Sequence, residues 1–406
     1  MGKIASLMND ILDFGGLILF CAGGLLLAIV VRVVAGRLGV PSAALLLVIA
    51  AAASDLVGRL STALSFQDVQ RIATVALLVI LFEGGAKIGT RRFREAALPI
   101  VVLGTVGTFA TAALLAVTAH WLLGLSWTVS GLLGAALSPT DPAVTFSVLA
   151  GREVEGRSGT ILEGESGFND PVGIALMIGM VEYATSEHGT VDGILSEFAK
   201  QMGIGLAVGI AGGAVLVAAL RHVRLPDRSL YPLAVLLLAA AVYGTATVAH
   251  GSGFLAVFVA GILVGDVRYP EESAVRSFNS AVADLGELAT FVALGITIDL
   301  ASIFTDGLWW RGLVLAALLG FVIRPLVVGP LLVPMRLNWG ERGFIVWSGL
   351  KGAVPILLAS LAVVGGTSHA KEIYGVVFVV VLLSVLVQGS LVPHVARRLG
   401  VPMERV

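Results

Sequence analysis

Two acidic residues, Asp141 and Asp170, lie inside apolar stretches of sequence that are long enough to cross a lipid bilayer. Asp170 belongs to the run Gly-Glu-Ser-Gly-Phe-Asn-Asp-Pro at 164–171, and Asp141 belongs to the run Ser-Pro-Thr-Asp-Pro at 138–142. A charged group is costly at membrane depth, so an ionisable residue there is by default a functional-site candidate. Carboxylate, hydroxyl and carbonyl oxygens suit hard cations such as Na⁺, Li⁺ or K⁺. These residues therefore predict a site for a monovalent cation.

The residues around Asp170 divide between two faces of one expected helix. Ser166 and Asp170 are four residues apart and share a face, whereas Glu165 and Asn169 share the neighbouring face by the same spacing. We expect Asp170 to hold either a cation or a proton, because a buried carboxyl without a cation favours its neutral form. Competition of both ions for one carboxyl would couple their fluxes. Glu165 is expected instead to pair with Arg324, which lies inside another apolar stretch.

Prolines interrupt the apolar stretch that contains Asp141. Pro139 and Pro142 are three residues apart, and each removes a backbone N–H and frees the carbonyl four residues earlier. Irregular backbone at membrane depth is tolerated only where it lines a cavity or is buried in protein. We therefore expect an unwound segment whose Thr140 and Asp141 side chains face a cavity.

A second break is expected at 349–355, which reads Gly-Leu-Lys-Gly-Ala-Val-Pro. Pro355 frees the carbonyl of Lys351, and Lys351 would neutralise the negative C-terminal ends of the facing half-helices. Half-helix ends near the bilayer midplane bind ions in many secondary transporters. The two breaks are seven spans apart, which fits inverted repeats of six spans joined by one linking span.

Composition supports a polytopic membrane protein. The chain has 406 residues, of which 57% are hydrophobic and only 13% charged, whereas soluble proteins carry about 25% charged residues. A formal net charge of −1 gives no indication of nucleic-acid binding. Cys21 is the single cysteine, so a disulfide within the chain is impossible. The longest polar stretches have the size of loops, so no soluble domain is expected.

We expect thirteen transmembrane helices, since each needs about 20 mostly apolar residues. Their centres are expected near residues 24, 48, 79, 108, 137, 171, 208, 239, 258, 289, 321, 353 and 384. Of the 26 Lys and Arg residues, 18 fall on one predicted side, six on the other and two within spans. The positive-inside rule then predicts a cytoplasmic C-terminus and an N-terminus outside.

These motifs, together with Phe-Glu-Gly-Gly at 82–85, resemble those of the monovalent cation/proton antiporter family (CPA1). The resemblance is to the NhaP-like sodium/proton exchangers and their potassium/proton relatives, and it spans nearly the whole chain. It implies the NhaA/NhaP-like antiporter fold, an all-α membrane protein of 13 helices with inverted six-helix repeats and two broken crossing helices. It also implies a homodimer in the cell (inner) membrane, with monovalent cations and protons as its partners, no cofactor and no enzymatic activity.

The resemblance also implies roles for single residues. Asp170 would bind the cation and the proton, and Ser166, the Thr140 backbone and Glu83 look like further ligands of Na⁺ or K⁺. Asn169 stands where electrogenic relatives have a second Asp, which implies electroneutral exchange. An alternative for Glu83 is a helix-end pair with a lysine four residues later.

Five residues concern the crossover and its support. Thr140 and Asp141 look like the residues that fill the crossover, and Glu165 looks like the acid that pairs with Arg324. Lys351 stands where the family usually has Arg, so a positive charge remains but the planar fork of a guanidinium does not. The resemblance implies a core ion-transport domain (95–194 and 306–406) that moves against a dimerisation scaffold (1–94 and 195–305).

The expected function is exchange of Na⁺ or Li⁺ for H⁺ by alternating access, with K⁺/H⁺ exchange as the alternative. An intramembrane aspartyl protease with Asp141 and Asp170 as its dyad is disfavoured, because prolines flank both acids and no Gly-x-Gly-Asp run is present. A channel is disfavoured by the lack of a repeated carbonyl filter sequence. The remaining acids near span ends are expected to be ordinary polar termini: Asp266, Asp284, Glu287 and Asp299.

Overall fold

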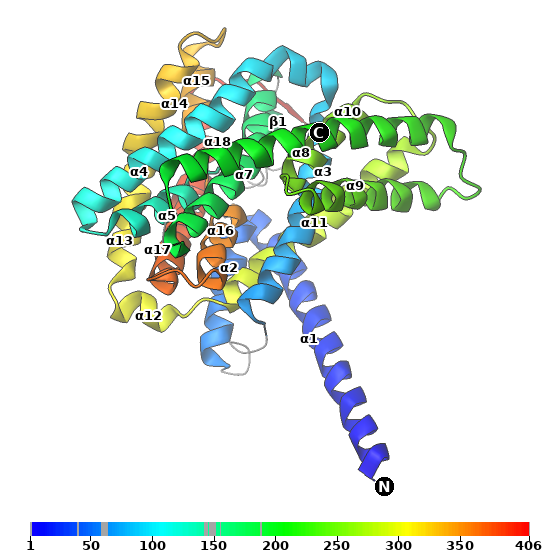
Figure 1. Ribbon diagram of the computed structural model, residues 1–406, viewed down its shortest axis with the longest axis horizontal. Coiled ribbons are helices and arrows are strands. Elements are labelled where there is room, and N and C mark those ends of the chain that lie inside the picture. The colour runs from blue at the N-terminus through cyan, green and yellow to red at the C-terminus, as the bar shows by residue number, and fades with distance from the viewer. Residues whose placement is uncertain are drawn as a thin grey trace.

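The computed structural model describes residues 2–38, 40–57, 64–141, 145, 152–154, 156–186 and 189–405. Over these ranges the chain forms a bundle of helices from which the N-terminal part of α1 projects (Figure 1). The first helices are α1 (Gly2–Leu38), α2 (Ser42–Leu56), α3 (Phe66–Val102), α4 (Thr108–Leu123), α5 (Trp127–Leu137), α7 (Gly156–Thr185), α8 (Val191–His222) and α9 (Leu230–Val248). They are followed by α10 (Gly253–Gly265), α11 (Glu272–Ile296), α12 (Leu300–Thr305), α13 (Leu308–Leu318), α14 (Arg324–Leu332), α15 (Trp339–Trp347), α16 (Ala353–Val364), α17 (Ala370–Leu383) and α18 (Ser390–Arg398).

Three short π-helical segments join neighbouring helices into longer rods. They are η1 (Leu103–Gly107), η2 (Leu319–Ile323) and η3 (Ser384–Gly389). Two three-residue strands, β1 (Arg152–Val154) and β2 (Met403–Arg405), pair antiparallel with Val154 opposite Met403. This pairing fixes the C-terminal end of the described chain beside the start of α7.

The predicted spans correspond to the helices. All thirteen predicted centres fall on a helix or on a break between two half-helices, and the predicted all-helical polytopic fold is confirmed. Among the described residues, six helical segments are long and apolar enough to cross a membrane, and four shorter apolar helices accompany them. The number of helices that cross the membrane stays a prediction. Pro142 lies outside the described residues.

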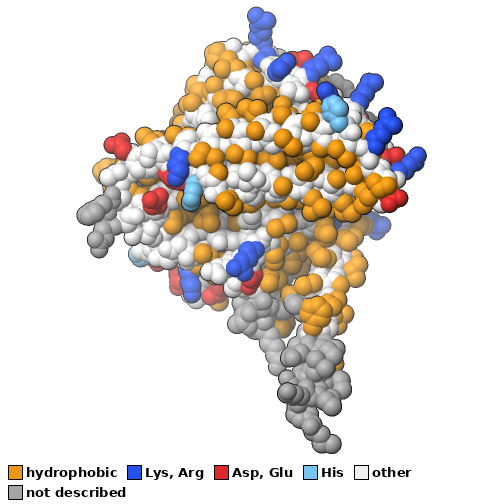
Figure 2. All heavy atoms as spheres, turned by 45° about the vertical axis from the view of Figure 1, so that its right-hand side comes forward, with side chains coloured by type: hydrophobic (Ala, Val, Ile, Leu, Met, Phe, Trp, Pro, Cys, Tyr) orange, Lys and Arg blue, Asp and Glu red, His pale blue; other side chains and the backbone are white. Residues whose placement is uncertain are grey.

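The surface fits a protein embedded in lipid. Many large apolar side chains are exposed, with Leu98 exposed by 73% and Trp121 by 75%. Figure 2 shows a broad apolar area with Lys and Arg side chains mostly along its upper and right-hand edges. This separation of apolar and basic surface is what an interface between hydrocarbon and polar headgroups requires.

A glycine kink divides α3 between spans three and four. Gly89 has φ 66° and ψ 170° inside an otherwise continuous helix, a conformation that residues with a Cβ rarely adopt. The Asp266 carboxylate accepts a hydrogen bond from the backbone N–H of Arg91 at 2.7 Å, which satisfies a donor that the kink would otherwise leave free. The kink therefore changes the direction of the helix within α3 without a separate loop.

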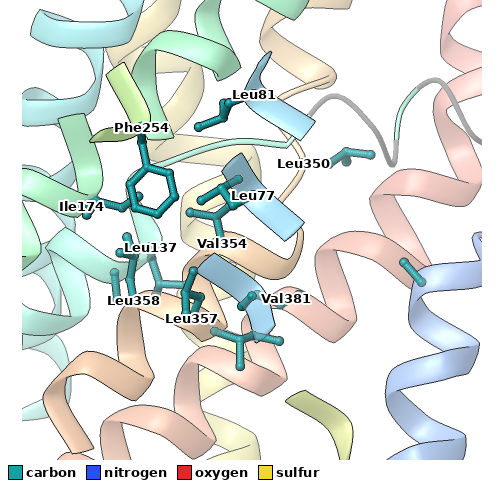
Figure 3. Packing of buried hydrophobic residues seen from close by; sticks show 14 of the residues in the cluster. Leu77, Leu81, Leu137, Ile174, Phe254, Leu350, Val354, Leu357, Leu358 and Val381 are labelled. Atoms are coloured by element: carbon teal, nitrogen blue, oxygen red, sulfur yellow. The ribbon is translucent and has the colours of Figure 1, made fainter. Parts of the chain in front are cut away.

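Helix packing around the centre of the bundle depends on small residues. α3 packs against α10 and α11, and Gly85 and Gly261 bring the α3 and α10 backbones into direct contact. Figure 3 shows buried apolar side chains from α3, α5, α7, α10, α16 and α17 and from the segment between α15 and α16. The labelled ones are Leu77, Leu81, Leu137, Ile174, Phe254, Leu350, Val354, Leu357, Leu358 and Val381. Leu137 and Leu350, which belong to this core, adjoin the two helix breaks.

Candidate functional site

Both predicted breaks are present, and the backbone joins them directly. α5 ends at Leu137 and is followed by irregular backbone at 138–141. α15 ends at Trp347 and α16 begins at Ala353, with non-helical residues between them. The backbone N–H of Asp141 donates to the carbonyl of Leu350 at 2.8 Å. The two broken helices therefore cross at one point, each satisfying a backbone group of the other.

The carbonyls at the end of α5 have partners from outside the helix. The Ser138 hydroxyl donates to the Ala135 carbonyl at 2.9 Å. The Lys351 Nζ donates to the carbonyls of Ser138 at 2.9 Å and Pro139 at 2.7 Å. These bonds place the amino group at the C-terminal end of α5, where the half-helix dipole is negative. Lys351 is only 2% exposed.

Arg324 occupies the corresponding position at the end of α15. Its Nε donates to the Val346 carbonyl at 3.0 Å, and its Nη2 donates to the Ile345 carbonyl at 3.2 Å. The same guanidinium makes two parallel hydrogen bonds to Glu165, at 3.0 Å and 3.2 Å. Gly349 permits this approach, since a Cβ there would collide with the guanidinium. Arg324 thus links α14, α7 and the first half of the broken helix.

Two side chains of α7 fix the break after α5. The Ser166 hydroxyl donates to the Thr140 carbonyl at 2.5 Å. Asn169 contacts Thr140 twice: its Nδ2 donates to Thr140 Oγ1 at 2.8 Å, and its Oδ1 accepts from the Thr140 N–H at 3.3 Å. Thr140, Ser166 and Asn169 are all buried. The structure therefore brings together three of the residues that the sequence assigned to the cation- and proton-binding site.

Asp141 and Asp170 line a cavity of about 50 Å³ at the crossing. Asp170 is 5% exposed, and its Oδ1 is buried without a hydrogen-bond partner among the described residues. Gly352 leaves room for the Asp141 carboxylate, which would collide with any Cβ at that position. A buried carboxylate oxygen without a donor is costly unless a cation or a proton joins it. Asp170 is the residue of this site that can accept either.

Glu287, expected to be a polar helix end, also lines this cavity. It lies well inside α11, and the structure records no hydrogen bond or ion pair for it within the described residues. The described residues contain no cluster of three His, Cys, Asp or Glu placed to chelate one metal ion. Because all three acids line this cavity, Glu287 faces Asp141 and Asp170. Its depth in an apolar segment is the same signal that identified Asp170.

Glu83 lies at a different cavity. Its carboxylate is 3.0 Å from Lys87 Nζ, four residues along α3, which is the helix-end pair considered as the alternative. Both residues line a cavity of about 300 Å³ together with Asn279 and Arg276. The structure does not bring Glu83 to the cavity of Asp170.

Comparison with known proteins agrees with this geometry. The family model described as "Sodium/hydrogen exchanger, transmembrane" matches residues 24–398. The K⁺/H⁺ antiporter NhaP of Alkalimonas amylolytica is 35% identical over 93% of this chain. The Na⁺/H⁺ antiporter ApNhaP of Aphanothece halophytica is 27% identical over 82% of it. The chain spans 66% of the length of each of these relatives.

The fold has a solved counterpart. The structure of the sodium proton antiporter MjNhaP1 from Methanocaldococcus jannaschii superposes with a TM-score of 0.80 at 22% identity. The match covers 92% of this chain and 98% of that one. Together with the extent of the family match, this confirms the resemblance seen in the sequence motifs. The chain belongs to the transmembrane sodium/hydrogen exchanger family and has the NhaP-like antiporter fold.

Proposed function

We propose that this chain is a secondary antiporter that exchanges a monovalent cation for H⁺, one for one, across the membrane. The observation that carries the proposal is the buried Asp170 carboxyl, which has an unpartnered oxygen facing a cavity at the crossing of two broken helices. A group that can take either a cation or a proton, but not both, couples the two fluxes. Membership of an exchanger family makes this a transport function rather than an enzymatic one.

The neighbouring residues have supporting roles in this proposal. Ser166 and Asn169 hold Thr140 so that its backbone stays beside Asp170. Lys351 and the Glu165–Arg324 pair hold the two half-helix ends in place. Asn169 contributes no charge, which supports electroneutral exchange.

We also propose the domain division that the sequence predicted, with 95–194 and 306–406 moving against 1–94 and 195–305. The cavity supports it, because Asp141 and Asp170 come from the first unit whereas Leu77 and Glu287 come from the second. Movement between the units would expose Asp170 to each side in turn. A homodimer, an N-terminus outside and a cytoplasmic C-terminus complete the proposal.

The transported cation is proposed to be Na⁺, Li⁺ or K⁺. The sequence favoured Na⁺ or Li⁺. K⁺ gains support from the relatives, because the one named as a K⁺/H⁺ antiporter is 35% identical and the one named as a Na⁺/H⁺ antiporter is 27% identical. Oxygen ligands do not distinguish these ions, since cavity size and ligand number decide between them.

Proton flux in proteoliposomes tests the proposal. We expect that adding Na⁺, Li⁺ or K⁺, but not choline, dissipates an imposed pH gradient reported by a trapped pH-sensitive dye. Collapsing the membrane potential with the permeant anion thiocyanate during the Na⁺ assay should leave the rate unchanged, because one-for-one exchange moves no net charge. A rate that is insensitive to every one of these cations would refute the proposal.

Glu287 provides a second prediction. We expect Glu287→Gln to raise the half-saturating cation concentration roughly fivefold, because losing a charge that faces the site costs about 1 kcal/mol of attraction. The maximal rate should change little, since Asp170 stays intact. Asp284→Asn is the matched control on the same helix, because Asp284 is exposed and is 3.2 Å from Arg32. Equal effects of the two substitutions would show that Glu287 has no specific role.

A further inference from the structure

A groove of about 450 Å³ lies outside the transport site, between α3, the start of α7 and the end of α14. Its wall is mostly apolar and includes two arginines, Arg157 and Arg336. The lining residues are Leu98, Pro99, Val102, Arg157, Pro330, Leu331, Pro334, Met335 and Arg336. None of them lines the cavity of Asp170 or that of Glu83.

The two positive charges of this groove have no acidic partner among the described residues. The structure records no hydrogen bond or ion pair for either Arg157 or Arg336 within the described residues, and Arg157 Nε is buried without a partner. Two like charges at one apolar-walled groove repel each other, and a buried guanidinium N–H needs an acceptor. An anion with several acceptor oxygens would satisfy both requirements. The guanidinium fork matches phosphate geometry in particular.

The position of the groove indicates where that anion comes from. Arg157 lies in the first turn of α7 and Arg336 follows α14, and both belong to the predicted side of the membrane that carries most of the basic residues. Leu98, which is exposed by 73%, belongs to the same wall one turn or more into the membrane from the basic segment of α3. A charged head beside an apolar wall matches a phospholipid, and basic pockets between helices on the cytoplasmic side commonly bind such headgroups.

We propose that this groove binds an anionic phospholipid, with its phosphate between Arg157 and Arg336 and an acyl chain along Leu98 and Leu331. The lipid would link the ends of α7 and α14 on one side of the membrane. Deeper in the membrane the same two helices are joined by Glu165 and Arg324. The lipid would thus form a second connection between α7, which carries Asp170, and α14. The proposal depends on membrane embedding but not on the transport activity.

Lipid binding to the purified full chain tests this inference. After delipidation in a mild detergent, native mass spectrometry would measure binding of phosphatidylglycerol and phosphatidylcholine, and thermal unfolding would measure stabilisation. We expect the wild type to prefer phosphatidylglycerol. The R157Q/R336Q double variant should bind it on the order of tenfold more weakly or worse, because charge-assisted hydrogen bonds are lost. R221Q/R224Q removes two exposed arginines on the same predicted side and should retain the wild-type affinity.

Three results would overturn the proposal. They are unchanged phosphatidylglycerol binding by the R157Q/R336Q variant, an equal loss of binding in the R221Q/R224Q control, and equal stabilisation of the wild type by millimolar inorganic phosphate. The last result would indicate a site for free phosphate instead. If the double variant does not fold, Arg336→Gln alone is the substitute, because Arg336 is exposed and its side chain has no recorded contact to lose. All readouts are independent of ion exchange, so they stay valid if the transport proposal fails.

Discussion

Replacing Asp170 with asparagine is expected to abolish coupled exchange while the protein still folds. The carboxylate supplies the charge that attracts the cation, and one unit charge about 4 Å from a cation is worth about 4 kcal/mol in a partly screened site, equivalent to roughly a thousandfold in affinity. Asparagine has nearly the same shape but can neither bind nor release a proton. Because Asp170 Oδ1 has no hydrogen-bond partner among the described residues, the substitution breaks no recorded contact of that oxygen.

The measurement is the cation-dependent dissipation of a pH gradient in proteoliposomes, with the thermal unfolding midpoint measured on the same preparation. Asp306→Asn is the matched control, since Asp306 lies in an exposed turn after α12. We expect the control to exchange at the wild-type rate. Retained cation-coupled proton flux in Asp170→Asn would mean that another group carries the proton, and Asp141 or Glu287 would be the next to replace.

Much of the scaffold of this site was predictable because the constraints of a membrane act on the sequence directly. Prolines and glycines in an apolar stretch leave backbone groups that lipid does not satisfy, so the breaks near Asp141 and Lys351 follow from residue type alone. The helix spacing that groups Ser166 with Asp170 is equally local. Such rules need no knowledge of which helices become neighbours.

Contacts between distant segments were harder to predict. The partner of the carbonyls freed by the α5 break is Lys351, 213 residues from Ser138 in sequence, and Arg324 caps the end of α15 as well as pairing with Glu165. The charge of Lys351 already predicted its position at a half-helix end, whereas the capping of α15 by Arg324 has no signal in the local sequence. Together they show one physical solution used twice: a buried cationic side chain meets the C-terminal carbonyls of each half-helix, where the backbone dipole is negative.

The roles of Glu83 and Glu287 were also hard to predict, because they depend on contacts between distant segments. Glu83 and Glu287 both lie in apolar helices, and motif resemblance favoured the first whereas the rule on buried charge applied to both. Only the packing of α3 against α11 decides which side chain faces Asp170. The structure gives that place to Glu287 and pairs Glu83 with Lys87.

The second large effect is expected at the buried pair of Glu165 and Arg324. Their side chains are only 3% and 6% exposed, so removing the acid alone leaves an uncompensated charge in the interior. Breaking a buried pair in this way costs about 3–5 kcal/mol. We therefore expect Glu165→Ala to lower the thermal unfolding midpoint of the purified protein strongly. Arg324→Ala should be at least as damaging, because the Ile345 and Val346 carbonyls lose their donor as well.

The double variant separates the pair from these other contacts. In Glu165→Ala/Arg324→Ala neither charge of the pair remains, so the loss should be smaller than the sum of the two single losses. The exposed pair of Arg91 and Glu95, 3.6 Å apart, is the matched control, and its coupling should be about 0.5 kcal/mol or less. Additive losses at Glu165 and Arg324 would mean that the two charges do not stabilise each other. The contact between α7 and α14 would then depend on packing alone, and the fixed position of Asp170 on α7 would need another explanation.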